Sequence, residues 1–161
     1  MAEETDNIAP NPYKNKVHAA LASSYSWYLL FFLLGICLDM FFPMNIVKSS
    51  ILTPLGFGIA VLATLLIFWA QKSSRKLDKE NLSMETFRKG PYKYLHHPTH
   101  MGLFLLLLGF AAMANALYLL ILTVLYAVFA KLFFFRKQDS ILEAKYGEHY
   151  REYRKSVKLK F

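Results

Sequence analysis

Charged residues are almost missing from three long segments of this 161-residue chain. The only charged residues in the runs at 25–42, 51–71 and 101–135 are Asp39 and Lys131. Segments of about 20 apolar residues are typical of helices that cross a membrane. The formal net charge of +8 would suit a soluble nucleic-acid-binding protein, but such a protein would not carry uninterrupted apolar runs. We therefore expect a membrane protein with basic loops, and no nucleic-acid partner.

Cysteine is scarce as well, since Cys37 is the only one and lies inside an apolar run. A single cysteine excludes an intramolecular disulfide and says nothing about the redox compartment. The first residues are acidic and polar, with no basic region ahead of a short apolar core. The N-terminus is therefore not expected to be a cleaved signal peptide. The sequence also has no internal repeat and no low-complexity segment.

The apolar runs predict an all-α integral membrane bundle of about four transmembrane helices. As one helix, the run from 101 to 135 would span about 50 Å at about 1.5 Å per residue, which is too long for a bilayer core. It is better explained as two helices that turn near Asn115. The predicted crossings are residues 25–42, 51–71, 99–115 and 116–135.

Polar segments flank these crossings. Residues 1–24 are predicted to be a polar tail, 72–98 a loop, and 136–161 an amphipathic tail that completes the site. Gly147 is expected to separate two short helices in that tail. Asp39 is expected to reach water at the membrane interface. Apolar residues of the loop could anchor it to the membrane surface, namely Leu77, Leu82, Met84 and Phe87.

Positive charge is concentrated on one side of this arrangement. Four crossings place both termini and the 72–98 loop on the same side, and these segments hold all but two of the 19 Lys and Arg residues. The exceptions are Lys48, in the opposite connection, and Lys131 within a helix. Because cytoplasmic loops are enriched in Lys and Arg, we expect a multi-pass protein with both termini and the site on the cytoplasmic face.

The reactive side chains gather just before the third crossing. Residues 89–102 read KGPYKYLHHPTHMG and contain His96, His97 and His100. Pro98 suits the first turn of a helix, whose free N–H groups favour an anion. Gly102 would let a ligand or another helix approach closely. The histidines could bind zinc, bond to headgroups and backbone, or form a cofactor and substrate site. Pro98 and the lack of a carboxylate within the stretch argue against the metal, so none is predicted.

Two motifs carry a family resemblance. Residues 90–102 (GPYKYLHHPTHMG) resemble the signature GPYRYVRHPxYxG of the isoprenylcysteine carboxyl methyltransferase and phospholipid methyltransferase superfamily. Residues 136–142 (RKQDSIL) and 146–153 (YGEHYREY) resemble its ending, RxEExxL followed by FGxxYxxY. The resemblance covers about 90–157. Three positions depart from the pattern: His96 replaces an arginine, His100 a tyrosine, and Gln138-Asp139 a glutamate pair.

The resemblance implies a small membrane enzyme that uses S-adenosyl-L-methionine. It would transfer a methyl group to a lipophilic acceptor from the bilayer, of prenylcysteine, phospholipid or small-lipophile type. His97 or His100 could act as the catalytic base for an amine acceptor. The absence of the arginine at His96 disfavours a carboxylate acceptor. The residues expected to bind the cofactor are His96, His97, Pro98, Gly102, Gln138, Asp139 and Tyr150.

Two other functions are compatible with the sequence. Membrane sterol reductases, which use a nicotinamide cofactor, carry a similar RHPxYxG and end in an aspartate followed by KYGxxWxxY. Asp139 and residues 145–153 resemble that ending, but such reductases are typically much longer than this chain. The departures from the methyltransferase pattern also allow a non-catalytic membrane subunit.

Overall fold

The computed structural model describes residues 12–48, 50–75 and 87–157, and within these ranges the chain is helical without a strand. This confirms the predicted all-α class. In chain order the elements are α1 (Pro12–Phe41), α2 (Leu52–Arg75), the 3₁₀ helix η1 (Gly90–Lys93), α4 (Pro98–Met113), α5 (Leu117–Phe129), the π-helical η2 (Ala130–Phe135), α6 (Arg136–Tyr146) and α7 (Glu148–Ser156).

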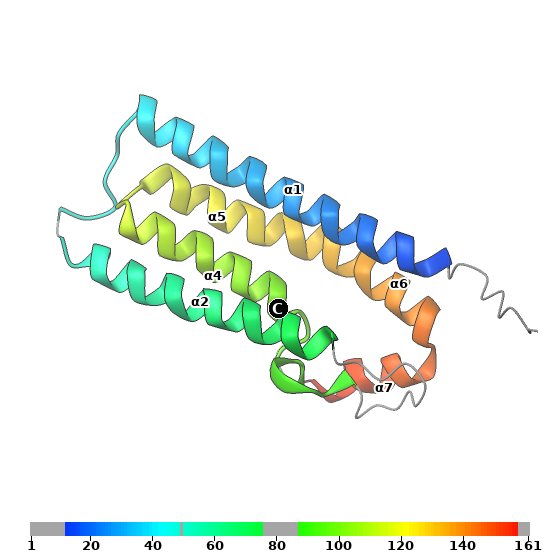
Figure 1. The fold of residues 1–161 in the computed structure, drawn as a ribbon. Helices are drawn as coiled ribbons and strands as arrows, with labels where there is room; N and C mark the ends of the chain where they lie inside the picture. The colour runs from blue at the N-terminus through cyan, green and yellow to red at the C-terminus, as the bar shows by residue number, and fades with distance from the viewer. Residues whose placement is uncertain (1–11, 49, 76–86, 158–161) are drawn as a thin grey trace, which may run out of the picture.

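The long helices lie side by side in the order α1, α5, α4, α2 (Figure 1). Helix α5 runs without interruption through η2 into α6, and α7 turns back beneath the ends of α2 and α4. The segments 42–48 and 113–117 meet at one end of the row, whereas η1, α7 and the start of α4 share the other end. This second end holds the polar motifs.

The α2–α4 contact depends on glycine. A Cβ atom added to Gly109 would lie 2.8 Å from the backbone N of Ala60 and 2.9 Å from the carbonyl oxygen of Gly56. A Cβ added to Gly56 would lie 2.4 Å from the backbone N of Met113. Close backbone approach of this kind is typical of helix pairs in lipid, where association relies on van der Waals packing.

The turn between α4 and α5 lies where the sequence predicts it. Asn115 adopts a φ of 50°, and its side-chain oxygen accepts hydrogen bonds from the backbone N–H groups of Ile46 and Val47 at 3.0 and 3.1 Å. Asp39 has a second role beside its predicted place at the membrane interface. Its carboxylate accepts hydrogen bonds from the N–H groups of Tyr118 and Leu119, at 3.2 and 2.8 Å, and so caps the first turn of α5.

Within the described residues, three helical segments are long and apolar enough to cross a membrane: Ala22–Phe41, Leu52–Ser74 and Leu117–Tyr146. Helix α4, the third predicted crossing, is apolar but only 16 residues long. The predicted boundaries fall inside longer helices, because α1 begins at Pro12 and the last long helix continues to Tyr146. The apolar runs mark only the part of each helix that would lie in lipid, whereas the helical backbone hydrogen bonding continues into the polar sequence beyond it. The assignment of tail, bundle and loop regions stays a prediction.

Helix α7 docks through an aromatic cluster. Phe87, Tyr150, Tyr153 and Val157 are buried together, and the Tyr153 hydroxyl donates a hydrogen bond to the carbonyl of Tyr92 at 3.0 Å. The prediction that Phe87 anchors to the membrane surface is therefore wrong, because its ring lies beneath α7. Leu77, Leu82 and Met84 lie outside the described residues. Gly147 separates α6 from α7 with a φ of 60°, which confirms its predicted position.

Candidate functional site

A cavity of about 340 Å³ lies at the end of the row that carries η1 and α7. Cavities of this size accommodate small molecules and cofactors. Its walls come from α1, α2, η1, α4, α6 and α7, so they combine segments far apart in the sequence. The aromatic wall consists of Tyr25, Phe87, Tyr92, Tyr146, Tyr150 and Tyr153. The polar lining includes Gln71, Ser73, Ser74, Lys89, His96, His97, Thr99, His100 and Gln138.

The histidine stretch enters the cavity at the beginning of α4. His97 is the N-cap residue and Pro98 occupies the first helical turn, as the sequence predicts. Proline is favourable there because its missing N–H would be unpaired in any residue. His96, His97 and His100 are each at least nine-tenths buried. The sequence thus places three imidazoles beside a helix N-terminus.

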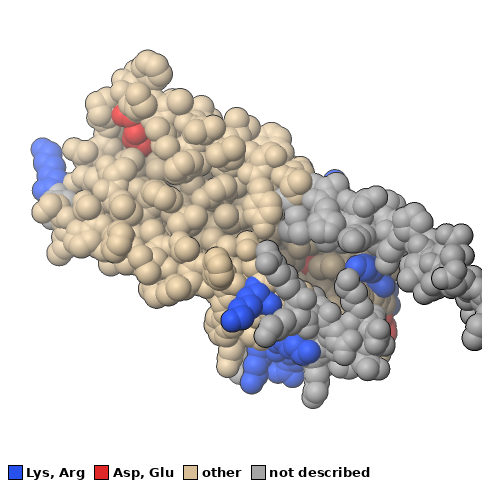
Figure 2. All heavy atoms as spheres, in the orientation of Figure 1, with Lys and Arg blue, Asp and Glu red and all other residues tan. Residues whose placement is uncertain are grey.

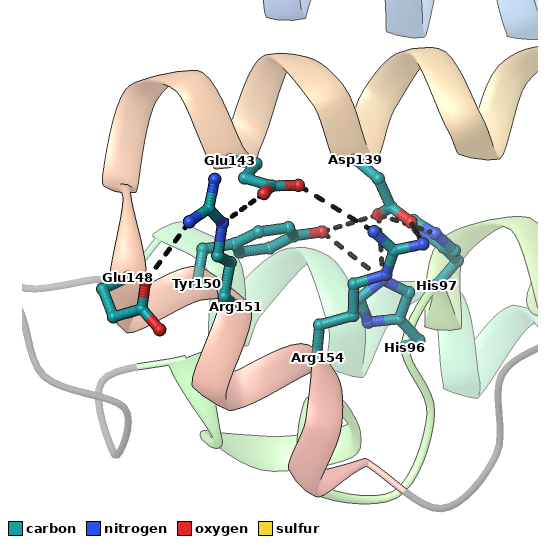
Figure 3. A network of polar contacts seen from close by, with 8 residues as sticks. All are labelled: His96, His97, Asp139, Glu143, Glu148, Tyr150, Arg151 and Arg154. Atoms are coloured by element: carbon teal, nitrogen blue, oxygen red, sulfur yellow. Dashed lines mark hydrogen bonds and ion pairs between the residues drawn. The ribbon is translucent and has the colours of Figure 1, made fainter.

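Asp139 of α6 connects this stretch to α7 (Figure 3). One carboxylate oxygen, Oδ1, accepts hydrogen bonds from His96 Nε2 at 2.8 Å and from the Tyr150 hydroxyl at 2.7 Å. The other, Oδ2, lies 3.4 Å from a guanidinium nitrogen of Arg154. Burial and the adjacent Asp139 carboxylate raise the pKa of Tyr150, so its hydroxyl stays a donor. We call Asp139, His96, Tyr150 and Arg154 the Asp139 network.

His97 has a nitrogen that the network does not satisfy. Its Nε2 lies 3.3 Å from Asp139 Oδ1, but it is buried and has no hydrogen-bond partner. Burial lowers the pKa of His97 below its usual value, so the imidazole is neutral near neutral pH. A buried unpaired nitrogen that lines a cavity is suited to contact a ligand.

His96, His97 and Asp139 could also hold a metal ion, since their ligand atoms lie within 4.8 Å of one another. The absence of a carboxylate within the sequence stretch is therefore offset by Asp139, a contact between distant segments. A metal bound to His96 Nε2 would leave the protonated Nδ1 of that ring buried without an acceptor. If His96 Nε2 instead donates a hydrogen bond to Asp139, the buried Nδ1 is unprotonated. A buried acceptor without a partner costs less free energy than a buried donor without one. The geometry favours the hydrogen-bonded arrangement.

His100 belongs to a separate group of polar contacts. Its Nδ1 lies 3.3 Å from the Ser24 hydroxyl of α1, and its Nε2 lies 3.1 Å from the Gln138 side-chain oxygen of α6. Ser24 is 1% exposed and His100 is 3% exposed. Both ring nitrogens are engaged, in contrast with His97 Nε2.

The structure distributes the predicted site residues over several roles. The cavity is lined by His96, His97, Pro98, His100, Gln138 and Tyr150, while Asp139 is not part of the lining and accepts hydrogen bonds from His96 and Tyr150. Gly102 faces α2, where an added Cβ atom would lie 2.4 Å from Ile67 Cγ1. Its position therefore serves helix packing.

Sequence reasoning named Tyr150 but missed the rest of the aromatic wall and the contribution of α1. The tyrosines of α7 recur at helical spacing, which indicates a buried face and could have suggested Tyr153. Arg154 lies on the same helix and reaches Asp139. Ser24 and Tyr25 give no sequence signal, because a serine and a tyrosine at the end of an apolar run are ordinary.

Basic residues gather at this end of the molecule. Figure 2 shows most of the visible Lys and Arg at the end that carries the cavity and some at the opposite end, while the flank of the long helices is free of them in that view. The exposed faces of α1 and α2 carry large apolar side chains, among them Leu33, Leu62 and Phe68. An apolar body with one basic end fits a protein embedded in a bilayer with its cavity at the surface.

Comparison with known families supports the interpretation of this chain as a membrane protein. The sequence model of the family described as phospholipid methyltransferase matches residues 49–149, which is more than half of the chain. A search of curated proteins and a search of solved structures each gave no match. The matched region contains α2, the histidine stretch, α4, α5 and α6. With its apolar helices and its cavity at their basic end, this chain belongs to the phospholipid methyltransferase family of integral membrane proteins.

Proposed function

We propose that this protein is an S-adenosyl-L-methionine-dependent methyltransferase that acts on a lipophilic acceptor. The observation that carries the proposal is the unpaired Nε2 of His97, buried in a cavity at the start of α4. The free N–H groups of the first turn of α4 suit the carboxylate of the cofactor or an anionic group of the acceptor. Family membership supplies the reaction class.

The residues present fit the cofactor. Bound S-adenosyl-L-methionine would supply an electrophilic methyl group. The aromatic wall offers ring faces that attract a cation, and Gln138, His96 and Thr99 offer polar atoms. Docked α7 covers the cavity with Tyr150 and Tyr153, which limits the access of water to the acceptor.

Proton transfer falls to His97. An amine acceptor must lose a proton, and His97 is neutral, with an Nε2 that makes no hydrogen bond of ordinary geometry. Asp139 Oδ1, at 3.3 Å, would stabilise the imidazolium that results. His100 is less suited to be the base, because Ser24 and Gln138 occupy both of its nitrogens.

The acceptor is proposed to be a lipophilic amine, thiol or weakly acidic group, in preference to a prenylcysteine carboxylate. Among the described residues that line the cavity, Lys89 is the only one with a permanent charge, and it is exposed. Arg154 is already paired with Asp139 and Glu143. A carboxylate acceptor would therefore find no free guanidinium in the described part of the site. The acceptor would enter from the bilayer, and the cofactor from the cytoplasmic face, which carries both termini.

The test is methyl transfer by detergent-purified protein. S-adenosyl-L-methionine labelled on its methyl group is incubated with membrane lipids or with a prenylcysteine analogue, and product is extracted into solvent. Wild type should label a lipid, and His97→Ala should lose activity and bind the cofactor more weakly. His149→Ala, at an exposed position of α7, is the matched control and should keep both.

Binding measurements separate the alternatives. Wild type that binds NADPH but not S-adenosyl-L-methionine would be a reductase, and wild type that binds neither would be a non-catalytic subunit. Full activity and full binding in folded His97→Ala would refute the role of that residue. Robust methylation of the prenylcysteine analogue alone would refute the acceptor preference.

A further inference from the structure

A surface groove of about 620 Å³ lies between α6 and α7. Its lining residues, most of which are exposed, are Arg136, Asp139, Ser140, Glu143, Ala144, Arg151 and Arg154. The described lining of this groove and that of the cavity at the start of α4 share no residue. We call it the arginine groove, and it is a separate site from the one proposed for methyl transfer.

The arginines of the groove can bind a further acceptor. Arg154 lies 3.4 Å from Asp139 Oδ2 and 3.9 Å from Glu143 Oε2, and both distances exceed the roughly 2.7–2.9 Å of a close charge-assisted hydrogen bond. Arg151 contacts Glu143, and Figure 3 shows both guanidinium groups extending from α7 toward α6. Arg136 is exposed and makes no ion pair with the described residues. Because a guanidinium carries several N–H donors, an added acceptor can bind beside these contacts.

The charge of the groove favours an anion. Its lining holds three arginines and two acids. One of the acids, Asp139, already accepts hydrogen bonds from His96 and Tyr150. A phosphate group suits such a site, because its oxygens accept paired N–H donors from more than one guanidinium.

The depth of the groove in the membrane points to a lipid as the source of the phosphate. The last long crossing begins at Leu117, and about 20 helical residues cover a hydrocarbon core of about 30 Å. Arg136 follows Leu117 by about that length, so it lies where the headgroups begin. One turn earlier, Leu132 and Phe133 are 51% and 60% exposed and would face acyl chains. A lipid can use both the groove and this apolar surface, whereas a free phosphate ion can use only the groove.

We propose that the arginine groove binds the phosphate group of an anionic phospholipid from the leaflet at this end of the molecule. Arg136 would contact the phosphate from α6, and Arg151 and Arg154 from α7, so the bound lipid would join the two helices. Because α7 covers the cavity with Tyr150 and Tyr153, the lipid would also hold that cover in place. The lipid is bound without reaction and outside the cavity, so the inference does not depend on the proposed function.

Native mass spectrometry of detergent-purified protein, titrated with phosphatidylglycerol or phosphatidylcholine, tests the binding. Wild type should bind phosphatidylglycerol about tenfold or more tightly than phosphatidylcholine. Arg136→Gln/Arg154→Gln should lose this preference, whereas Lys137→Gln/Lys155→Gln should keep it. The two double variants remove the same charge from adjacent exposed positions of the same helices. No preference in wild type, or an equal effect of the two double variants, would overturn the proposal.

Two further measurements complete the test. Inorganic phosphate should leave the lipid bound, and displacement of phosphatidylglycerol at equal concentration would assign the groove to a free ion and overturn the lipid. If Arg136→Gln/Arg154→Gln does not fold, Arg136→Gln/Arg151→Gln removes two exposed guanidinium groups instead and should lose the same preference. In nanodiscs, hydrogen exchange of α7 should be about tenfold slower with phosphatidylglycerol than with phosphatidylcholine, in line with the ratio of affinities. Equal exchange of α7 in the two lipids would overturn the joining of the helices.

Discussion

Replacing Asp139 with Asn is expected to release α7 from the cavity without unfolding the helical row. Asp139 is 6% exposed, and its Oδ1 accepts hydrogen bonds from His96 and Tyr150. Asparagine keeps one side-chain oxygen but loses the charge, and its amide group brings N–H donors toward groups that are donors themselves. The substitution therefore removes one buried hydrogen bond and weakens the other.

The size of the effect follows from the contacts. A hydrogen bond to a charged group contributes about 1.5–3 kcal/mol, and a donor left unpaired in the interior costs about 1–3 kcal/mol. The pair with Arg154 adds little, because that side chain is 46% exposed and water screens it. Allowing for overlap between these contributions, we expect a loss of about 3 kcal/mol in the docking of α7. Such a loss raises the equilibrium for local opening by about 100-fold.

Hydrogen exchange measured by mass spectrometry is the suitable assay, because it reports local opening segment by segment. In Asp139→Asn the amides of α7 (Glu148–Ser156) should lose about 100-fold in protection, while those of α4 and α5 stay unchanged. Glu143→Gln is the control, since Glu143 pairs with the exposed Arg151 and a surface ion pair contributes at most about 1 kcal/mol. Equal exchange in α7 of both variants would refute the argument that the buried carboxylate holds this helix.

Three further predictions concern packing, pH and topology. Gly109→Ala should destabilise the fold by about 1–3 kcal/mol in thermal unfolding, because the new Cβ would meet the α2 backbone, whereas Gly58→Ala should have little effect since nothing lies within 4 Å of that position. The pKa of His97 lies below 6.5 in the folded protein, so the unfolded chain binds more protons as the pH falls below 6.5. The free energy of unfolding should therefore decrease toward acidic pH, and His97→Gln should make it depend less on pH. Reporter fusions should place Lys48 outside and Lys89 in the cytoplasm, and the reverse would contradict the charge argument.

The sequence predicts the helices well because each depends on local pattern. The turn near Asn115 and the break at Gly147 follow from residue type and spacing, and both are found. Helix ends that lie in polar sequence are harder to predict, since residues 12–24 and 136–146 are helical without being apolar. Apolar pattern alone cannot reveal that α5 continues through η2 into α6.

The site was predictable only in part, because its parts are joined by long-range contacts. The histidine stretch and Asp139 each stand out in the sequence, but the 2.8 Å contact between His96 and Asp139 depends on how α6 passes the start of α4. The burial of Phe87 depends on the docking of α7, which no local pattern reports. Ser24 enters the site because α1 packs beside α5 and α6, an arrangement set by tertiary structure.

The position of the carboxylate in this site bears on the proposed chemistry. Asp139 does not line the cavity but contacts His96, Tyr150 and Arg154, and the described lining of the cavity contains no acidic residue. In methyl transfer from a sulfonium, positive charge on the sulfur diminishes as the reaction proceeds. A carboxylate directed at that charge would stabilise the bound reactant more than the transition state and would slow the reaction. Aromatic faces attract the cation less strongly, so a wall of tyrosines can hold the cofactor at a smaller cost to the rate. The Asp139 network thus allows an acid to organise the site without facing the reacting group.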